Sequence, residues 1–273
     1  GGHSHTYMPQ PEVVNNILIA QAAVGTDQIG RFDIVVDDDT NSIVEWKWQL
    51  VPICSNTIQP DEELQKFIDS YSSEIDRKYS TLLCRTAQEL THPSRIIETS
   101  LGNLFADIFA ENGVCDVALI GSGSIRQKQM GPVVTLRDLR QTFPYDDVYR
   151  RFTVTGEQVQ RIFSHIMRAE NRNSEGECYQ VNRGVHAVYD GHLNKLVSLE
   201  IKGKPIDPQA HYTIGLSDYH YSNVLQNLGI SNEEITALSA PKVTATSMIN
   251  VAEEYLRSHQ NLSSQVEGRS VYL

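Results

Sequence analysis

The sequence predicts an α+β fold, with strands and helices mixed along the chain. Runs rich in β-branched residues and amphipathic helical segments follow one another without a repeating strand-helix-strand rhythm, which is typical of this class. Neither an internal repeat nor a low-complexity tract interrupts the pattern. A chain of 273 residues can bury roughly 75% of the surface that its unfolded form exposes, so we expect a substantial core.

The first 55 residues contain strand patterns but no helical pattern. β-rich runs cover residues 16–24, 30–37 and 42–50, and a turn at 38–41 separates the last two. Three consecutive strands without a helix predict the end of a sheet rather than a domain of their own. The string GGHSHT at 1–6 begins abruptly, so we expect it to be the edge of a longer chain.

An amphipathic helix is predicted over residues 61–79. Acidic residues open this segment, basic residues close it, and apolar positions recur at helical spacing, so the charges complement the helix dipole. We expect residues 56–80 to link two separate bodies. Beyond this linker, the pattern predicts helices near 100–111, 135–141, 156–169 and 247–258. It predicts strands near 115–120, 148–154, 178–181, 185–189, 196–201, 212–216 and 269–272.

Charge and hydropathy exclude two classes of partner. The formal net charge is −11 and the pI is near 5.3, which argues against a surface that follows the phosphates of a nucleic-acid polymer. No apolar run approaches the roughly 20 residues of a membrane span, so no membrane segment is predicted. The cysteines form no Cys-x-x-Cys pair, so we interpret them as small buried hydrophobes rather than metal ligands or disulfides. They are Cys54, Cys84, Cys115 and Cys178.

The stretch from Asp116 to Arg126 carries the clearest candidate for binding chemistry. An apolar run ends in a small-residue loop at 121–124, and Ile125 and a single arginine follow it. Such a loop lets the backbone turn sharply and approach a ligand closely. A guanidinium delivered there suits a phosphate or a carboxylate, because its planar fork matches two anionic oxygens. The alternative is that the loop only connects two elements.

Seven strings are recognisable together and in order: GGHSHT, GRFDIVVD, ETSLGNLFADIF, GSGSIR, FPYDDVYRRFTVTGEQV, CYQVNRGVHAVYD and VEGR. In this order they resemble the 5'-nucleotidase family, which includes ecto-5'-nucleotidase and the periplasmic UDP-sugar hydrolases. The resemblance covers nearly the whole chain. It implies a calcineurin-like metallophosphatase domain, a linking helix and a C-terminal domain that recognises the nucleoside.

The resemblance also implies a division of this chain into three parts. Residues 1–55 would be the truncated end of the metallophosphatase β-sheet, and 56–80 the linking helix. Residues 81–273 would be the C-terminal substrate-binding domain, a mixed sheet with packed helices. The partner of this chain is then the metallophosphatase domain that precedes it in the family.

Two arginines are implied as phosphate ligands. Arg126 stands at the position of the family's glycine-loop arginine, and Arg95 precedes the string ETSLGN as the family's other phosphate arginine does. Gly123 and Ser124 would lie beside the ligand in the same loop. For each arginine the alternative is a surface salt bridge.

Two tyrosines are implied as the sides of a base clamp. Tyr145 and Tyr219 stand where the family carries aromatic residues, and a base held between two rings gains about 1–3 kcal/mol for each stacked contact. The alternative is that each tyrosine is a half-buried packing residue at a strand end. The family's glycine-rich Gly-Gly-Asp-Gly-Phe string is absent, and Gly121 replaces its loop asparagine. Asp218 or Asn223 is the substitute for the ribose-binding aspartate by proximity alone.

His3 and His5 are the candidate metal ligands. Their spacing lets two imidazoles reach two neighbouring metal ions from the same side. The resemblance implies two divalent ions, such as zinc or manganese, in the intact enzyme, with the remaining ligands and the catalytic histidine outside this chain. We therefore expect no ordered metal centre and no catalytic residue in this chain. The alternative is that the two histidines belong to a disordered end.

The resemblance implies that the intact enzyme hydrolyses nucleoside 5'-phosphates to a nucleoside and phosphate, and that this chain alone is inactive. Two other functions remain open. One is a non-enzymatic nucleotide-binding module, and the other is a relative acting on UDP-sugars, cyclic nucleotides or dinucleotides. The family is mostly extracytoplasmic, in the periplasm or at the cell surface, but the sequence leaves the compartment undetermined because the cysteines do not demand oxidation.

Overall fold

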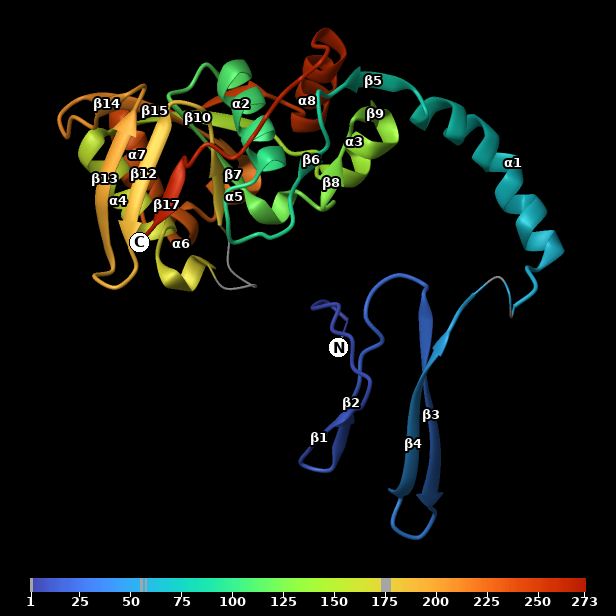
Figure 1. The fold of residues 1–273 in the computed structure, drawn as a ribbon. Coiled ribbons are helices and arrows are strands. Elements are labelled where there is room, and N and C mark those ends of the chain that lie inside the picture. The colour runs from blue at the N-terminus through green and yellow to red at the C-terminus, as the bar shows by residue number, and fades with distance from the viewer. Residues whose placement is uncertain (1, 55, 57, 173–177) are drawn as a thin grey trace. The chain divides into compact units, whose positions relative to one another are not determined.

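The computed structural model describes residues 2–54, 56, 58–172 and 178–273. The chain divides into two compact units, Gly1–Ser73 and Glu74–Leu273, and each is described by itself (Figure 1). Both hydrophobic cores found among the described residues belong to the second unit. Within the described ranges, no helix combines the length and apolar character that a membrane span requires.

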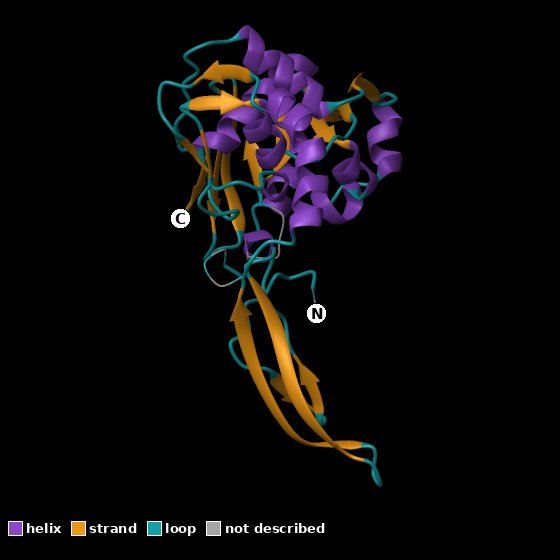
Figure 2. Cartoon of the chain, turned by 90° about the vertical axis from the view of Figure 1, so that its right-hand side faces the viewer, coloured by secondary structure: helices purple, strands orange, loops and turns teal. Residues whose placement is uncertain are grey.

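The first unit contains two antiparallel hairpins. β1 (Glu12–Val14) pairs with β2 (Ile17–Ile19). β3 (Gln28–Asp37) and β4 (Ser42–Pro52) form the longer hairpin, which Figure 2 shows as two extended ribbons. The turn between them is the one that the sequence predicts.

The strand predicted over residues 16–24 is shorter in the structure. Asn16 and Ala23 adopt left-handed backbone angles, with a φ of 63° at both positions, and such angles interrupt a strand. Ala22 forms an isolated antiparallel bridge with Tyr7 instead. The apolar segment that was predicted as one strand therefore contains a short strand followed by a bend.

The long hairpin leaves its apolar side chains largely in solvent. Ile34 is 50% exposed and Trp46 is 38% exposed, and no described hydrophobic residue of the first unit is buried. The closest packing is between Phe32 and Trp48, whose ring centroids lie 4.5 Å apart. Gly30 makes room for the Trp48 ring, because a Cβ at this position would lie 2.3 Å from it. These strands do not build a core of their own.

Helix α1 (Glu62–Tyr79) forms where the sequence predicts it. The Asp61 carboxylate accepts hydrogen bonds from the backbone amides of Glu63 and Leu64 and so caps the first turn. Basic residues occupy the last turn. None of the helix's residues is buried, so its apolar stripe is exposed.

The second unit is built on a five-stranded mixed sheet with helices packed against it. The strand order is β11–β7–β15–β10–β16, in which β7 and β15 are parallel and the other neighbours are antiparallel. These strands are β7 (Val117–Gly121), β10 (Tyr149–Thr155), β11 (Tyr179–Val181), β15 (His211–Ser217) and β16 (Lys242–Ala245). The architecture agrees with the mixed sheet and packed helices that the sequence predicts.

Smaller sheets complete the unit. A four-stranded sheet has the order β14–β13–β12–β17, with β17 parallel to β12. Its strands are β12 (Val185–Asp190), β13 (Lys195–Ile201), β14 (Lys204–Pro205) and β17 (Ser270–Tyr272). Two short antiparallel pairs are β5 (Leu82–Arg85) with β9 (Val133–Thr135) and β6 (Leu90–Thr91) with β8 (Gln129–Met130).

The five-stranded sheet has a separate hydrophobic core on each face. On β10, Tyr149 enters one core, whereas Phe152 and Val154 enter the other, because successive side chains of a strand point to opposite faces. The Tyr149 core is covered by α2 (Ser100–Gly113), α3 (Leu136–Thr142) and α8 (Met248–Ser258). The four-stranded sheet joins the other core with α4 (Gly156–Ile166), α6 (Val224–Leu228) and α7 (Asn232–Leu238). The short helix α5 (Asp218–Ser222) follows β15 directly.

Side-chain caps fix where the helices begin. The Thr99 hydroxyl accepts a hydrogen bond from the Gly102 amide at the start of α2. Thr155 and Gln158 form a reciprocal capping box at the start of α4. Helix α4 ends at Ile166, three residues earlier than predicted, because the backbone leaves the helix at Met167.

Candidate functional site

Three loops of the second unit lie at one edge of the five-stranded sheet. β7 and β15 are parallel, so their C-terminal ends point to the same edge. β10 is antiparallel to β15, and Tyr149 at its beginning pairs with Ser217 at the end of β15. The loops 122–126, 143–148 and 218–223 therefore meet at this edge, and they contain most of the predicted substrate-binding residues.

The small-residue loop is a tight turn over a buried floor. Ser122–Ser124 form a single 3₁₀ turn, which the Ile125 amide closes by donating to the Ser122 carbonyl at 3.2 Å. Ser122 is fully buried, and Gly123 and Ser124 are half-buried. The predicted sharp turn is present. Gly121, however, has a φ of −58°, which any residue adopts, so its conformational freedom is not what the turn requires.

Arg126 is exposed at the end of this turn. Its guanidinium Nη1 donates to the Gly123 carbonyl at 3.3 Å, and its backbone amide donates to the Thr142 carbonyl at 2.7 Å. The second bond ties the loop to the end of α3. In the part of the chain that the structure describes, neither Arg126 nor the half-buried Arg95 forms an ion pair with a carboxylate. Among the described residues, neither arginine therefore forms the surface salt bridge that was the alternative.

The loop that carries Arg95 joins the same edge through His92. The His92 amide donates to the Lys128 carbonyl at 2.7 Å, and the His92 imidazole Nε2 bonds to the Ser122 carbonyl at 3.2 Å. A carbonyl only accepts hydrogen bonds, so Nε2 must carry the proton. Burial lowers the pKa of His92 most strongly, and the charge of Arg95 lowers it further, so the ring is neutral at pH 7.

This pKa shift gives a testable dependence of stability on pH. Because the pKa of His92 is lower in the folded chain than its ordinary value of 6.5, the unfolded chain binds more protons in that range. The stabilisation of the folded chain by neutral His92 is complete above the pKa that His92 has in the unfolded chain. It is lost as the pH falls through the pKa that His92 has in the folded chain. We expect the free energy of unfolding, measured by urea titration, to fall between about pH 7.5 and pH 5. His92→Gln should make the free energy of unfolding depend less on pH. An equal dependence on pH in the variant and the unaltered chain would contradict the lowered pKa of His92.

Tyr145 and Tyr219 are both exposed at the sheet edge, at 51% and 67%. The Asp147 carboxylate links their segments, because Oδ1 accepts from the Val148 amide and Oδ2 accepts from the Tyr219 amide, each at 2.8 Å. The Tyr219 and His220 rings lie edge to face, with the ring centroids 5.2 Å apart. Neither tyrosine is thus a half-buried packing residue. Both rings are accessible to a planar ligand.

Asp218 is engaged by an arginine that the sequence analysis did not single out. Its carboxylate forms a close ion pair with the Arg150 guanidinium, which also lies 5.6 Å from the centre of the Tyr221 ring. The pair borders an open cleft of about 800 Å³ beside α5 and α6. Asn223, also on this cleft, donates from its amide to the Tyr219 carbonyl at 2.9 Å. A ribose hydroxyl would therefore compete with Arg150 for Asp218.

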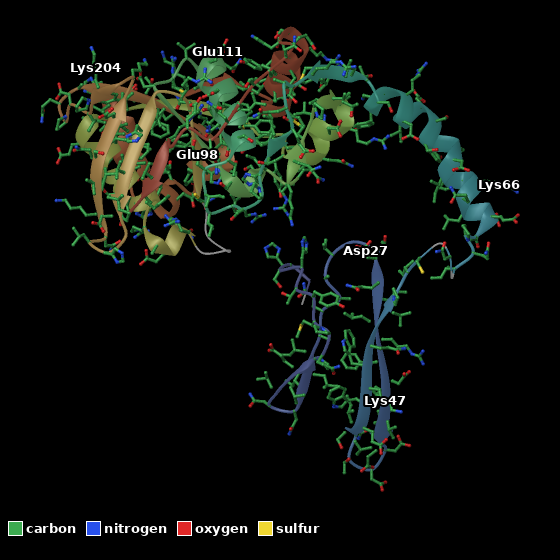
Figure 3. All side chains as sticks on the ribbon, in the orientation of Figure 1. Asp27, Lys47, Lys66, Glu98, Glu111 and Lys204 are labelled. Carbon is green, nitrogen blue, oxygen red and sulfur yellow. The ribbon has the colours of Figure 1, made fainter. Side chains whose placement is uncertain are left out.

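The string ETSLGN has a structural role. The Glu98 carboxylate, labelled in Figure 3, accepts hydrogen bonds from the Asn103 amide and from the backbone amides of Glu267 and Arg269, at 2.7, 2.8 and 2.7 Å. These bonds fasten the C-terminal segment to the start of α2.

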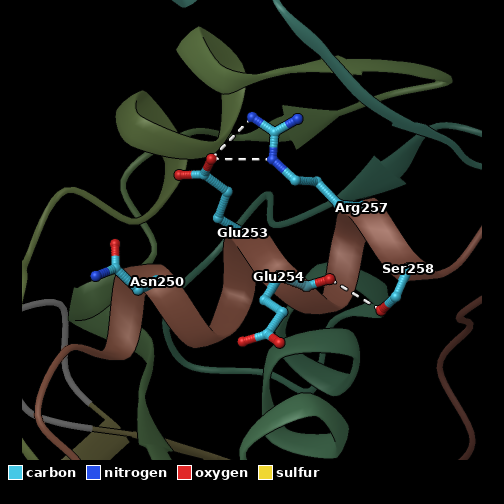
Figure 4. A pocket seen from close by; sticks show the side chains of 5 residues that line it. All are labelled: Asn250, Glu253, Glu254, Arg257 and Ser258. Atoms are coloured by element: carbon cyan, nitrogen blue, oxygen red, sulfur yellow. Dashed lines mark hydrogen bonds and ion pairs between the residues drawn. The ribbon is translucent and has the colours of Figure 1, made fainter.

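A separate hollow of about 480 Å³ lies on α8 and contains none of the predicted site residues. Figure 4 shows its five lining side chains, among which Glu253 and Arg257 form an ion pair at 2.9 Å. Because this pair is one helical turn apart and each partner satisfies the other, it offers no open charge to a ligand. Arg257 is a suitable control for substitutions of Arg126.

His3 and His5 are exposed in the turn that precedes the Tyr7–Ala22 bridge. No group of three His, Cys, Asp or Glu side chains that could hold a metal ion occurs in the described ranges. Two imidazoles do not complete the coordination of a divalent ion. The residues present therefore do not fit a two-metal centre, and we derive no catalytic step from them.

Comparison with known proteins identifies the family. The family of 5'-nucleotidase C-terminal domains matches residues 80–224, which is more than half of the chain. The chain belongs to this family. The matched range includes the four segments that carry Arg95, Arg126, Tyr145 and Tyr219.

Relatives of this 5'-nucleotidase C-terminal domain include two curated bacterial proteins. The chain is 24% identical to Endonuclease YhcR of Bacillus subtilis (strain 168) over 97% of its own length and 21% of that protein. It is 22% identical to Protein UshA of Yersinia enterocolitica over 96% of its own length and 50% of that protein. The chain thus spans half or less of the length of these relatives.

Solved structures share the fold. A 5'-nucleotidase precursor from Thermus thermophilus matches 96% of the chain with 54% of its own, at a TM-score of 0.75 and 18% identity. The sulfate thiohydrolase SoxB from the same species matches 100% of the chain with 49% of its own, at a TM-score of 0.68 and 18% identity. At this identity the likeness establishes the fold alone.

Proposed function

We propose that this chain is the nucleotide-recognition portion of a metal-dependent 5'-nucleotidase-type phosphoesterase. In this proposal residues 81–273 bind the substrate, residues 56–80 link two domains, and residues 1–55 are the end of a metallophosphatase β-sheet. One observation supports the proposal most strongly. Two exposed tyrosines and two arginines lie on segments at one edge of the central sheet, and hydrogen bonds connect each of these segments to the next. Within the described ranges, neither arginine has a carboxylate partner.

The chemistry of these residues suits a nucleotide. The rings of Tyr145 and Tyr219 would hold a base by stacking, which discriminates little between bases. The guanidinium groups of Arg95 and Arg126 would hold the phosphate by forked hydrogen bonds, with Gly123 and Ser124 beside it. Binding here would orient the phosphoester rather than break it, because none of these residues is placed to activate a nucleophile.

The first unit supports the wider assignment to a two-domain enzyme. Its hairpin exposes apolar side chains such as Ile34 and Trp46 and forms no core, which is the expected behaviour of strands that belong to a larger sheet. The chain matches about half of the Thermus thermophilus 5'-nucleotidase precursor. The two divalent ions of the proposed parent enzyme would need ligands beyond His3 and His5.

Calorimetric titration of the chain tests this function. We expect a nucleoside monophosphate to bind more tightly than its nucleoside, because the arginines act only on the phosphate. Inorganic phosphate alone should bind more weakly than the nucleotide, because it lacks the stacked base. No binding of any nucleotide in the millimolar range would refute the proposal.

The chain by itself is expected to hydrolyse no nucleoside monophosphate, even with Mn²⁺ or Zn²⁺ added. The described residues supply no group of side chains that could complete a metal centre, and the proposal assigns the catalytic histidine to the part of the parent enzyme outside this chain. Release of phosphate from AMP, measured by a colorimetric assay, should equal the buffer blank. Hydrolysis that survives replacement of both His3 and His5 and repeated purification would show that the catalytic assignment is wrong.

The ion pair between Arg150 and Asp218 favours a second candidate substrate class. Because Asp218 is engaged, ribose recognition would differ from that of the family, and a UDP-sugar, a cyclic nucleotide or a dinucleotide becomes the alternative ligand. Titrations with UDP-glucose, cyclic AMP and a dinucleotide, compared with a titration with AMP, distinguish the two substrate classes. Tighter binding of one of these ligands than of AMP would favour the alternative.

A further inference from the structure

A buried polar cluster lies beneath the small-residue loop. It consists of His92, Thr99, Ser122 and Gln180, which are 4%, 1%, 0% and 2% exposed. His92 and Thr99 lie in one segment, whereas Ser122 and Gln180 come from two others. Buried polar groups are costly unless their hydrogen bonds are made, so a cluster of this kind holds its members in one arrangement.

Gln180 on β11 joins the two arginine-bearing loops. Its Oε1 accepts from the Thr99 amide at 3.0 Å, and its Nε2 donates to the Ile97 carbonyl at 2.8 Å and to the Ser122 hydroxyl at 2.7 Å. One side chain thus reaches the loop of Arg95 and the loop of Arg126 together. Gly102 on α2 makes this possible, because a Cβ there would lie 2.4 Å from Gln180 Oε1.

His92 makes a second connection between the same loops. Its Nε2–H donates to the Ser122 carbonyl, and its Nδ1 accepts from the Thr99 hydroxyl at 2.9 Å. The Thr99 hydroxyl oxygen in turn accepts from the Gly102 amide at 3.0 Å. The cluster therefore connects both loops to the first turn of α2 as well.

We propose that Gln180, together with His92 and Ser122, is a positioning residue that holds the Arg95 and Arg126 loops at a fixed separation for anion binding. This inference rests on the proposed nucleotide site. Two cations brought to one ligand repel each other before it binds, so a rigid buried framework prepares the site and lowers the cost of binding. None of the three is among the predicted substrate-binding residues, so in this proposal the cluster acts only through the two loops.

Two substitutions test this role in the full 273-residue chain. Gln180→Met keeps the volume and removes every side-chain hydrogen bond of Gln180, whereas Ser122→Ala removes the one bond between the Gln180 amide and the Ser122 hydroxyl. We expect Gln180→Met to weaken AMP binding about tenfold, as for one misplaced charge-assisted hydrogen bond, and to leave adenosine binding unchanged. Ser122→Ala should act in the same direction with a smaller loss.

Leu199→Ala is the matched control. Leu199 lies in the core on the other side of the sheet from Tyr149, so this variant destabilises the unit without touching the cluster. It should lower the melting temperature and leave the ratio of AMP to adenosine affinity unchanged. That ratio separates positioning from general loss of structure.

The outcomes are distinct. If the unaltered chain binds no nucleotide, the proposed function fails and this inference fails with it. If the unaltered chain binds AMP and the folded Gln180→Met variant keeps the same affinity ratio, the positioning role alone is overturned. If Gln180→Met does not fold, Ser122→Ala decides, and an unchanged ratio in that variant overturns the inference.

Discussion

Replacing Arg126 with alanine is expected to weaken the binding of a nucleoside monophosphate by about 10- to 100-fold, with no change in nucleoside binding. Hydrogen bonds to a charged group contribute about 1.5–3 kcal/mol, and each 1.4 kcal/mol is a factor of ten in affinity. Arg126 has no carboxylate partner among the described residues, so its removal leaves no buried carboxylate without a partner there. Calorimetric titration with AMP and with adenosine measures both effects.

Two matched variants make the result specific to Arg126. Arg126→Lys should recover only part of the affinity, because an ammonium cannot form the forked pair of hydrogen bonds. Arg257→Ala removes another exposed arginine, whose partner is Glu253, and should leave AMP binding unchanged. Equal losses for AMP and adenosine in Arg126→Ala would contradict a phosphate-binding role.

Replacing Tyr145 and Tyr219 together with alanine is expected to reduce adenosine binding by about 30-fold or more. Each base stacked on an aromatic ring gains about 1–3 kcal/mol, so the double variant should lose both contributions. Both rings are more than half exposed, at 51% and 67%, so their removal leaves little cavity and should change the melting temperature only slightly. Titration with adenosine and thermal unfolding measure the two quantities.

The control for the tyrosines uses rings of similar exposure. Tyr145→Phe and Tyr219→Phe should bind normally, because stacking needs the ring rather than the hydroxyl. Tyr71→Ala removes a tyrosine on α1 that is 59% exposed and should have no effect on binding. If the double alanine variant binds adenosine as the unaltered chain does, the base does not lie between these rings.

Most elements with strong periodicity could be predicted from the sequence. Helix α2 and strand β7 form where the apolar pattern places them, because long regular patterns specify burial on a defined face. The short pairs β5–β9 and β6–β8 and the short helices α5 to α7 were not predicted. Length alone does not explain this, because the three-residue strands β11 and β17 and the seven-residue helix α3 were predicted.

The candidate site residues could be chosen from the sequence where they lie in recognisable strings. The turn at 122–124, the arginine after it and the exposed tyrosines lie in recognisable strings. Arg150 and Gln180 lie in strands, and their importance comes from partners far away in the sequence, Asp218 and Ser122. Only tertiary contacts reveal such residues. The interpretation of all four cysteines as buried is confirmed for Cys84 and Cys178 only. Cys115 is half-buried, and Cys54 is exposed because the first unit builds no core.

A crystal structure of the chain with bound AMP would show directly which residues hold the nucleotide. We expect the adenine between the rings of Tyr145 and Tyr219, and the phosphate within hydrogen-bond distance of the Arg126 guanidinium and the loop at 122–124. The base bound instead in the cleft beside Arg150 and Asp218, with both tyrosine rings free of ligand, would contradict the proposed site.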